Sequence, residues 1–293
     1  MSNQSLVRMG IYMEENFYEI LAKIEEADHI LIGASNGLSI SEGIHIFADN
    51  AAFQENFGDF REKYGFCSII QGCFYPFPSE EEKWAFFSRL YDYFLYKGEA
   101  SSVMKNLYEL VKDKNFFVVT SNIDDHFRQA GFPIDRLFEI EGNCRNLQCL
   151  HGCHEQIYSG DEILSKMAKQ QENGKVPLDL IPKCPECGGP MKVHVEVDQN
   201  FLKGEAWQTS YQAYQDFINH AHGKKFVLLE LGVGARNQLI KAPFMNLTNH
   251  EEQATYITFN RGSELYIPDA IAAKSIGIDG NIAEVLQQLV EMK

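Results

Sequence analysis

Two close pairs of cysteines, in the stretches CLHGC and CPEC, have the residue type and spacing of a zinc site. The four residues are Cys149, Cys153, Cys184 and Cys187. The N-terminal stretch has no apolar segment typical of a secretion signal, so metal ligation is favoured over disulfide bonds. Four thiolates complete a tetrahedral coordination shell, and the pattern therefore predicts a closed, structural zinc site. His151 and His154 are alternative ligands.

Small and polar residues follow several short apolar runs, where they could bind phosphate or ribose. The turn from Gly33 to Gly37 could hold a pyrophosphate on free backbone N–H groups, although its spacing also suits an ordinary turn. Asn122 and Asp124 could bind ribose hydroxyls or a carboxamide, or they could begin the next helix. Glu141 could act as a general base or bind a ribose hydroxyl, with a solvated glutamate as the alternative.

The elements that carry these groups alternate along the chain. Short apolar runs, expected to be buried strands, cover residues 29–34, 116–122, 137–142, 226–234, 255–260 and 274–278. Helical periodicity, often with acidic first turns, covers residues 14–27, 79–97, 102–114, 205–221 and 281–293. This alternation predicts an α/β fold, a Rossmann-like doubly wound parallel sheet whose ligands bind beyond the carboxyl ends of the strands.

Two segments interrupt the alternation. Residues 44–99 are rich in aromatic side chains and carry no clear strand, which predicts a helical insertion over the cleft. Residues 144–203 contain the paired cysteines and are expected to form a small zinc-binding lobe. Residues 1–143 and 204–293 are then expected to form the larger Rossmann-like lobe.

Composition limits the classes of partner. The chain has 293 residues, 45% of them hydrophobic, and a formal net charge of -15. This negative charge disfavours binding to nucleic acid or to anionic membrane surfaces. No apolar stretch reaches the length of a membrane-spanning helix, so a soluble cytoplasmic protein is expected.

In their order, these motifs resemble the sirtuin family over nearly the whole chain. They are the glycine loop, T-x-N-x-D, the paired cysteines, G-x-G at 232–234, and an asparagine, Asn260, after a strand. The macrodomain-linked sirtuins resemble the chain most, since they share the C-x-x-x-C first pair, the aromatic insert and the AFFSRLYDYF helix. The resemblance implies a sirtuin fold with a zinc-ribbon lobe and NAD bound between the lobes.

The resemblance also assigns residues by position. It implies catalytic roles for Asn122, Asp124 and Glu141, and zinc ligation by the four cysteines. The residues that it places against NAD are Gly33, Ala34, Ser35, Gly37, Leu38, Ser121, Asn122, Asp124, Gly232, Val233, Gly234, Asn260, Arg261, Ile278 and Asp279.

Three positions depart from deacylating sirtuins. Glu141 stands where those enzymes have a histidine that acts as general base, and Ser121 replaces the glutamine of T-Q-N. GIHIFADN replaces G-I-P-D-F-R and removes an arginine from the nicotinamide end.

The macrodomain-linked sirtuins resemble this chain in lacking the histidine. They are associated with mono-ADP-ribosylation of a lipoylated glycine-cleavage H-like carrier. The resemblance therefore implies an NAD-dependent protein mono-ADP-ribosyltransferase, with a protein acceptor and a macrodomain hydrolase acting in opposition. The alternatives are a protein-lysine deacylase that uses Glu141, a plain NAD glycohydrolase, and a non-catalytic module that binds NAD or ADP-ribose.

Overall fold

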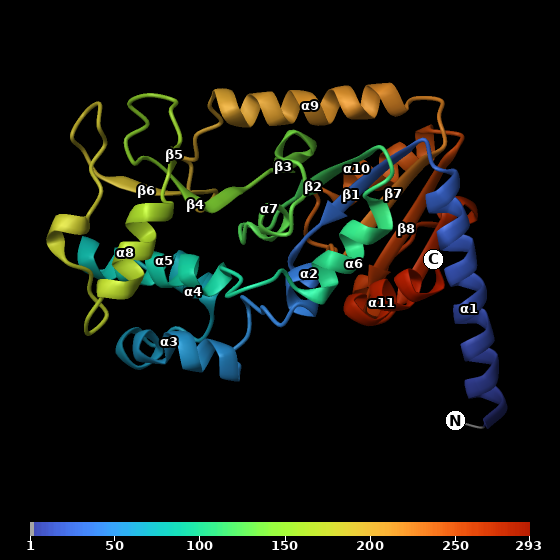
Figure 1. The fold of residues 1–293 in the computed structure, drawn as a ribbon, viewed down its shortest axis with the longest axis horizontal. Helices are drawn as coiled ribbons and strands as arrows, with labels where there is room; N and C mark the ends of the chain where they lie inside the picture. Colours follow the sequence, from blue (N-terminus) through green and yellow to red (C-terminus); the bar gives the residue numbers. More distant parts are fainter. Residues whose placement is uncertain (1–2) are drawn as a thin grey trace.

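The computed structural model describes the backbone of residues 3–293 and the side chains of residues 14–293. Within these residues the larger lobe holds a six-stranded parallel sheet in the order β3-β2-β1-β7-β8-β9 (Figure 1). Its strands are β1 (His29–Ala34), β2 (Phe116–Thr120), β3 (Leu137–Glu139), β7 (Phe226–Leu231), β8 (Ala254–Asn260) and β9 (Ser275–Asp279). Every apolar run that was expected to form a strand does so.

The chain order reverses between β1 and β7, which lie side by side in the sheet. From β1 the chain continues to β2 and β3 on one side, whereas β7 leads to β8 and β9 on the other. A ligand crevice opens at such a point, beyond the carboxyl ends of the strands. The predicted doubly wound α/β fold is confirmed, and its switch point places the crevice next to Ala34 and Leu231.

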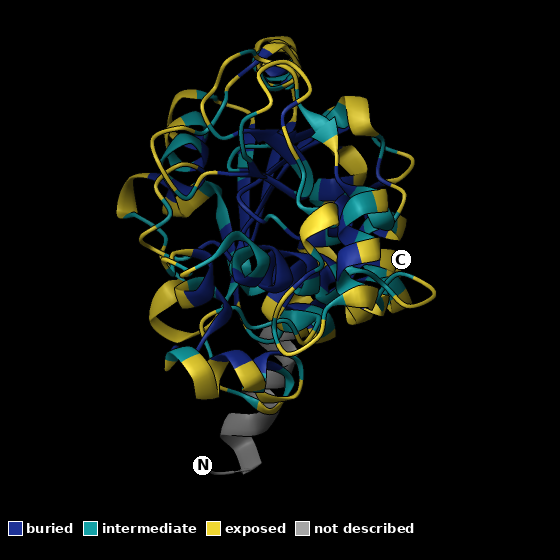
Figure 2. Cartoon of the chain, turned by 90° about the vertical axis from the view of Figure 1, so that its left-hand side faces the viewer, coloured by how far each residue is buried: buried dark blue, intermediate teal, exposed yellow. Residues whose placement is uncertain are grey.

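Helices cover both faces of this sheet. Side chains of β1 alternate between two cores, with Ile30 and Ile32 in one and Leu31 in the other. The helices of the first core are α1 (Asn3–Glu26), α6 (Ser102–Val111) and α11 (Ile282–Met292). Those of the second are α9 (Glu205–Ala221) and α10 (Lys241–His250). Figure 2 shows the buried sheet between helices whose outer faces are exposed.

The smaller lobe combines an antiparallel sheet with helices from the aromatic insertion. Among the described residues its strands are β4 (Gly142–Cys149), β5 (Tyr158–Ser159) and β6 (Met191–Val195), in the order β5-β4-β6. Its helices are α3 (Ala51–Tyr64), α4 (Ile69–Cys73), α5 (Glu80–Phe94) and α8 (Asp161–Gln170). Aromatic residues of α3 and α5 share one hydrophobic cluster with β4, β6 and α8. The predicted insertion is therefore helical, and it contributes to the core of the small lobe.

Short elements complete the chain. They are α2 (Asn36–Ser41), α7 (His126–Gln129) and the 3-10 helices η1 (Ile134–Arg136), η2 (Leu178–Leu180), η3 (Gly262–Glu264) and η4 (Asp269–Lys274). In the part of the chain that the structure describes, no helix has the length and apolar character needed to cross a bilayer.

Candidate functional site

A cleft of about 900 Å³ lies at the carboxyl ends of the strands of the large sheet. Seven of the predicted site residues line it: Ser35, Gly37, Ser121, Glu141, Gly232, Gly234 and Asn260. A second cavity of about 220 Å³ shares Gly37, Ile40 and Asn260 with the cleft and adds Arg261. The two cavities therefore adjoin at these three residues.

Gly37 and Gly232 bring two loops into direct contact beside this space. The Gly37 N–H donates a hydrogen bond of 3.0 Å to the Gly232 carbonyl oxygen. A Cβ atom on Gly37 would lie 2.4 Å from the Cα of Gly232, and Gly232 has a positive φ of 62°. Only glycine tolerates so close an approach in this backbone conformation.

Gly33 lies where the first strand packs against α10. A Cβ atom there would lie 2.6 Å from the Phe244 ring of α10, so this glycine allows the helix to pack on β1. Four further predicted NAD contacts, Ala34, Leu38, Val233 and Ile278, are buried in the cores beneath the cleft. Asp279 is exposed and accepts a hydrogen bond of 2.9 Å from the Gly262 N–H. None of these six residues lines either of the two cavities.

Asn122 and Asp124 lie just behind the cleft wall, and both are buried. The Asn122 Nδ2 donates to the Ser35 carbonyl oxygen at 3.2 Å. Its buried Oδ1 atom has no hydrogen-bond partner among the described residues. An unpaired buried acceptor is costly, so it indicates a ligand that brings an O–H or N–H group, as a ribose or a carboxamide does.

The carboxylate of Asp124 is held on both of its oxygen atoms. Its Oδ2 accepts a hydrogen bond of 2.6 Å from the Ser39 hydroxyl, and its Oδ1 accepts one of 3.1 Å from the His126 N–H. This carboxylate is therefore fixed in orientation before any ligand binds.

A buried ion pair stands behind Asp124. The Nδ1 of His126 lies 2.9 Å from Oε1 of Glu42. The Glu42 Oε2 accepts hydrogen bonds from the hydroxyls of Ser101 and Tyr96. Burial lowers the pKa of His126, but Asp124 and Glu42 outweigh it and raise the pKa to about 9. His126 is thus a cation at neutral pH. The two partners lie 84 positions apart in the sequence, so no local pattern indicates the pair.

Glu141 lines the cleft from the loop between β3 and β4. Burial raises its pKa to about 7, and the nearby Glu196 carboxylate adds to this effect. A carboxylate whose pKa lies near neutrality can exchange a proton with a reacting group.

Residues that sequence reasoning missed complete the cleft. They are Asn36, Ile40, His45, Phe47, Arg236, Asn237, Gln238, Leu239 and Glu264. Phe47 and Leu239 are each 52% exposed, which gives the cleft an apolar border. His45 and Phe47 lie within GIHIFADN, Asn36 lies within the glycine turn, and residues 236–239 follow the G-x-G motif, which were the available signals.

A charged network joins the two lobes near this cleft. Asp125, at the start of α7, accepts hydrogen bonds from Arg128 Nε at 3.0 Å and from Arg145 of β4 at 2.8 Å. Arg145 also pairs with Asp161 at the start of α8. The network therefore ties the loop after β2 to the small lobe.

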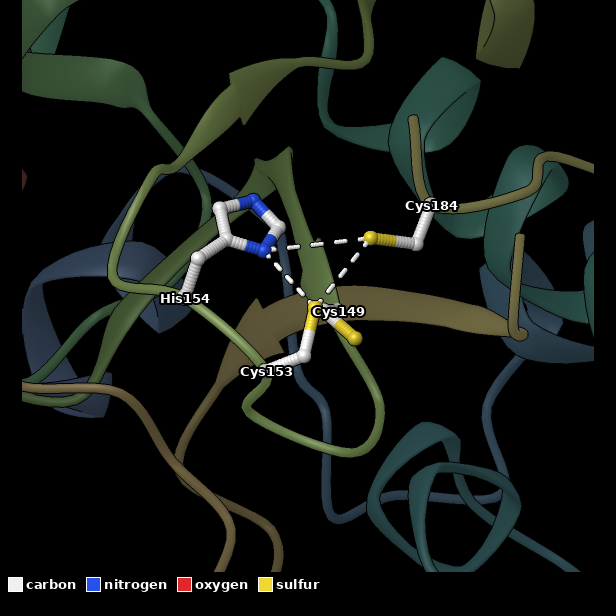
Figure 3. Close-up of side chains that lie close together, drawn as sticks. All are labelled: Cys149, Cys153, His154 and Cys184. Atoms are coloured by element: carbon white, nitrogen blue, oxygen red, sulfur yellow. Dashed lines mark hydrogen bonds between the residues drawn. The ribbon is translucent and has the colours of Figure 1, made fainter. Parts of the chain in front are cut away.

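The paired cysteines meet in the small lobe. The Sγ atoms of Cys149 and Cys187 are 3.7 Å apart, and those of Cys153 and Cys184 are 3.6 Å apart. Zinc–sulfur bonds of about 2.3 Å in a tetrahedron require sulfur separations of roughly 3.8 Å, so these distances fit zinc. His154 also lies here, and its Nδ1 is within 4.8 Å of the Sγ atoms of Cys149, Cys153 and Cys184 (Figure 3). The cluster is consistent with a structural zinc ion and offers five candidate donors.

The sequence matches the Sir2 family over residues 36–221. The chain belongs to the Sir2, or sirtuin, family. It is 31% identical to "Protein ADP-ribosyltransferase" of Staphylococcus aureus, covering 95% of this chain and 89% of that protein. It is 26% identical to "Probable bifunctional ADP-ribose hydrolase/ADP-ribosyltransferase" of Fusarium oxysporum f. sp. cubense, covering 92% of this chain and 46% of that protein.

Solved sirtuin structures share the fold. "Crystal structure of a Sir2 homolog-NAD complex" aligns with a TM-score of 0.62 at 15% identity, covering 94% of this chain and 93% of that chain. "The Structural basis of Sirtuin Substrate Affinity" aligns with a TM-score of 0.59 at 16% identity, covering 94% of this chain and 98% of that chain. The predicted family and the predicted sirtuin fold are therefore confirmed.

Proposed function

We propose that this sirtuin is an NAD-dependent protein ADP-ribosyltransferase. The observation that carries the proposal is Glu141, a carboxylate with a pKa near 7, in the cleft wall where deacylating sirtuins have a histidine. The name of the Staphylococcus aureus relative, which aligns over nearly the full length of both chains, supports the same activity. In the reaction NAD supplies the ADP-ribosyl group, and nicotinamide leaves.

We assign this chemistry to Asn122 and Asp124 behind the cleft wall and to Glu141 in it. Asn122 offers its unpaired Oδ1 to a ribose hydroxyl or to the carboxamide of the leaving group. Asp124, fixed by Ser39 and His126, places negative charge where a cation develops as the ribose–nitrogen bond breaks. Glu141 takes the proton that the acceptor nucleophile loses as it bonds to the ribose carbon.

The cofactor contacts are proposed along the two adjoining cavities. Ser35, Gly37, Ser121, Gly232 and Gly234 line the part where a pyrophosphate and ribose would be held on loop N–H and hydroxyl groups. Asn260 and Arg261 line the smaller cavity, which suits the adenosine end. Gly33, Ala34, Leu38, Val233, Ile278 and Asp279 would contribute by supporting these loops from beneath or from the side.

For the metal, we propose that Cys149, Cys153, Cys184 and Cys187 hold a structural zinc ion. The two sulfur separations of 3.7 Å and 3.6 Å support this set. His154 would then remain a neighbour of the site, with Nδ1 3.0 Å from the Cys153 Sγ and Nε2 2.8 Å from the Tyr158 hydroxyl. The ion would link the β4 end to the CPEC turn and stabilise the small lobe at 144–203 against the larger lobe.

The acceptor is proposed to be a protein, specifically a lipoylated carrier of the glycine-cleavage H type. The apolar border at Phe47 and Leu239 suits an aliphatic group next to the cleft. A macrodomain hydrolase would remove the modification, and the printed name of the Fusarium relative combines the two activities. This pairing is supported by the family resemblance and by that name.

The decisive experiment incubates the protein with NAD and a carrier protein, with and without its lipoyl group, and measures intact masses. An added ADP-ribose on the lipoylated carrier is expected. An acyl-lysine peptide in a parallel reaction tests the deacylase alternative, which two Pseudomonas relatives named "NAD-dependent protein deacylase 2" keep relevant. NAD loss without any protein acceptor would indicate a glycohydrolase, and binding without turnover would indicate a non-catalytic module.

A further inference from the structure

The side chains of Ser35, Ser121 and Asn237 form a closed hydrogen-bonded triangle in the wall of the cleft. The Asn237 Nδ2 donates to Ser121 Oγ at 2.7 Å and to Ser35 Oγ at 3.1 Å. The two hydroxyl oxygens are themselves 3.0 Å apart. The three residues come from the loops after β7, β1 and β2, so the triangle fastens three strand ends to one another.

The triangle leaves one hydroxyl proton free. The Asn237 amide donates to both serine oxygens, and one hydroxyl proton lies between those two oxygens. Within the described residues the second hydroxyl proton of the pair therefore has no acceptor. Each serine hydroxyl carries a single proton, so the pair offers one hydrogen-bond donor to a ligand.

Asn237 supplies a hydrogen-bond acceptor. Its Oδ1 atom is buried, and no described residue donates to it. The cleft wall thus carries a donor on the Ser35–Ser121 pair and an acceptor on the neighbouring Asn237 side chain. A phosphate oxygen satisfies the donor but brings no proton for the acceptor, whereas a ribose hydroxyl satisfies the acceptor.

We propose that Asn237 is a positioning residue that orders the Ser35 and Ser121 hydroxyls, so that the wall recognises a phosphate next to a ribose. The inference rests on the proposed function, because the ligand is the ADP-ribosyl part of NAD. It also accounts for Ser121, which stands where deacylating sirtuins have the glutamine of T-Q-N. Here an amide from the loop after β7 contacts the Ser121 hydroxyl.

Calorimetry with ADP-ribose and with inorganic phosphate tests this inference on the purified full chain. Asn237→Ala is expected to weaken ADP-ribose binding about 10-fold, because a buried donor and acceptor are both lost. Asn237→Asp is expected to weaken ADP-ribose binding at least as much. A carboxylate would accept hydrogen bonds from the two serine hydroxyls where the amide donates to them, and it would add negative charge beside the phosphates. Inorganic phosphate alone is expected to bind far more weakly than ADP-ribose.

Controls separate positioning from folding. Asn246→Ala removes an exposed asparagine on α10 outside both cavities and should leave the ADP-ribose Kd unchanged. The double variant Ser35→Ala/Asn237→Ala should lose less affinity than the sum of the two single losses, because both act through one triangle. Thermal unfolding of each variant shows whether the fold is intact.

Two results would overturn the inference. One is an Asn237→Asp protein that binds ADP-ribose as tightly as the wild type. The other is an Asn237→Ala protein with a lowered Tm and an unchanged Kd, which would make the triangle a purely structural brace. A wild-type protein that fails to bind ADP-ribose would instead refute the proposed function, so the two failures are distinguishable.

Discussion

The imidazole of His126 and the carboxylate of Glu42 form an ion pair, with Nδ1 and Oε1 2.9 Å apart and each side chain only 2% exposed. His126 also donates its backbone N–H to Asp124, so the pair supports a carboxylate next to the cleft. Because the pair is buried and contacts Asp124, breaking it should affect both the stability of the fold and the position of the Asp124 carboxylate.

The His126 pair predicts a loss of stability at alkaline pH. The folded pKa of about 9 exceeds the ordinary value of 6.5, so the stabilisation is complete below pH 6.5 and disappears as pH rises through 9. Chemical unfolding at several pH values should show the wild type losing up to about 3 kcal/mol across this window.

Two variants check the source of that loss. His126→Gln should start less stable and show a much smaller change between pH 6.5 and 9. His222→Asn removes an exposed histidine paired with Glu251 and should behave like the wild type. An unaltered alkaline loss in His126→Gln would rule the pair out as its cause.

Glu141 predicts an acid limb in the pH profile of ADP-ribosyl transfer. With a pKa of about 7, Glu141 is mostly protonated below that pH, so kcat/KM should fall roughly tenfold per unit as pH decreases and level off above 7. Glu141→Gln should reduce the rate by about 100-fold or more and abolish the limb. Glu196→Gln removes a neighbouring like charge and should move the limb to lower pH. A limb that persists in Glu141→Gln would assign the titration to another group, such as Glu139, whose pKa burial also raises to about 7.

The close contact between Gly37 and Gly232 can be tested by adding a methyl group to Gly37. Gly37→Ala places a Cβ 2.4 Å from the Gly232 Cα, so the two loops must separate. We expect a destabilisation of about 1–3 kcal/mol and markedly weaker ADP-ribose binding. Gly58→Ala is the matched control in α3, where no described atom lies within 4 Å of the added methyl, and it should stabilise the protein slightly. Undiminished ADP-ribose binding by Gly37→Ala would contradict the role of the loop contact.

Zinc removal tests the small lobe. Metal analysis should find one zinc ion per chain, and Cys184→Ser should lose the ion and lower Tm, because the closed site links separate segments. The exposed Cys67 lies outside the cluster, and Cys67→Ser should retain zinc.

A second pair of variants tests whether Cys187 or His154 is the fourth zinc ligand. Cys187→Ser should lose zinc, whereas His154→Ala should keep it. The reverse pattern would replace the four-cysteine set by the Cys149, Cys153, His154 and Cys184 set.

Much of this fold follows from local pattern. The strand 226–231 is buried at every position, and its apolar run, interrupted only by Glu230, could be recognised in the sequence. The T-x-N-x-D motif and the G-x-G motif could likewise be recognised in the sequence from their residue types and from their positions after strands. The helical nature of 44–99 was predicted, but its share in the small-lobe core depended on contacts between α3, α5 and β4 that no local pattern encodes.

The sequence by itself determined the sirtuin family, the order of the strands and helices, and the paired cysteines, because periodicity and motif spacing are local properties of the chain. Only the tertiary structure decided that Glu42 would pair with His126 and that Asn237 would hydrogen-bond Ser35 and Ser121. It also assigned Gly33 to the packing of α10 and Gly37 to a contact between loops. These are relationships between residues far apart in the chain, and they arise only when parallel strands bring their carboxyl ends to one edge of the sheet.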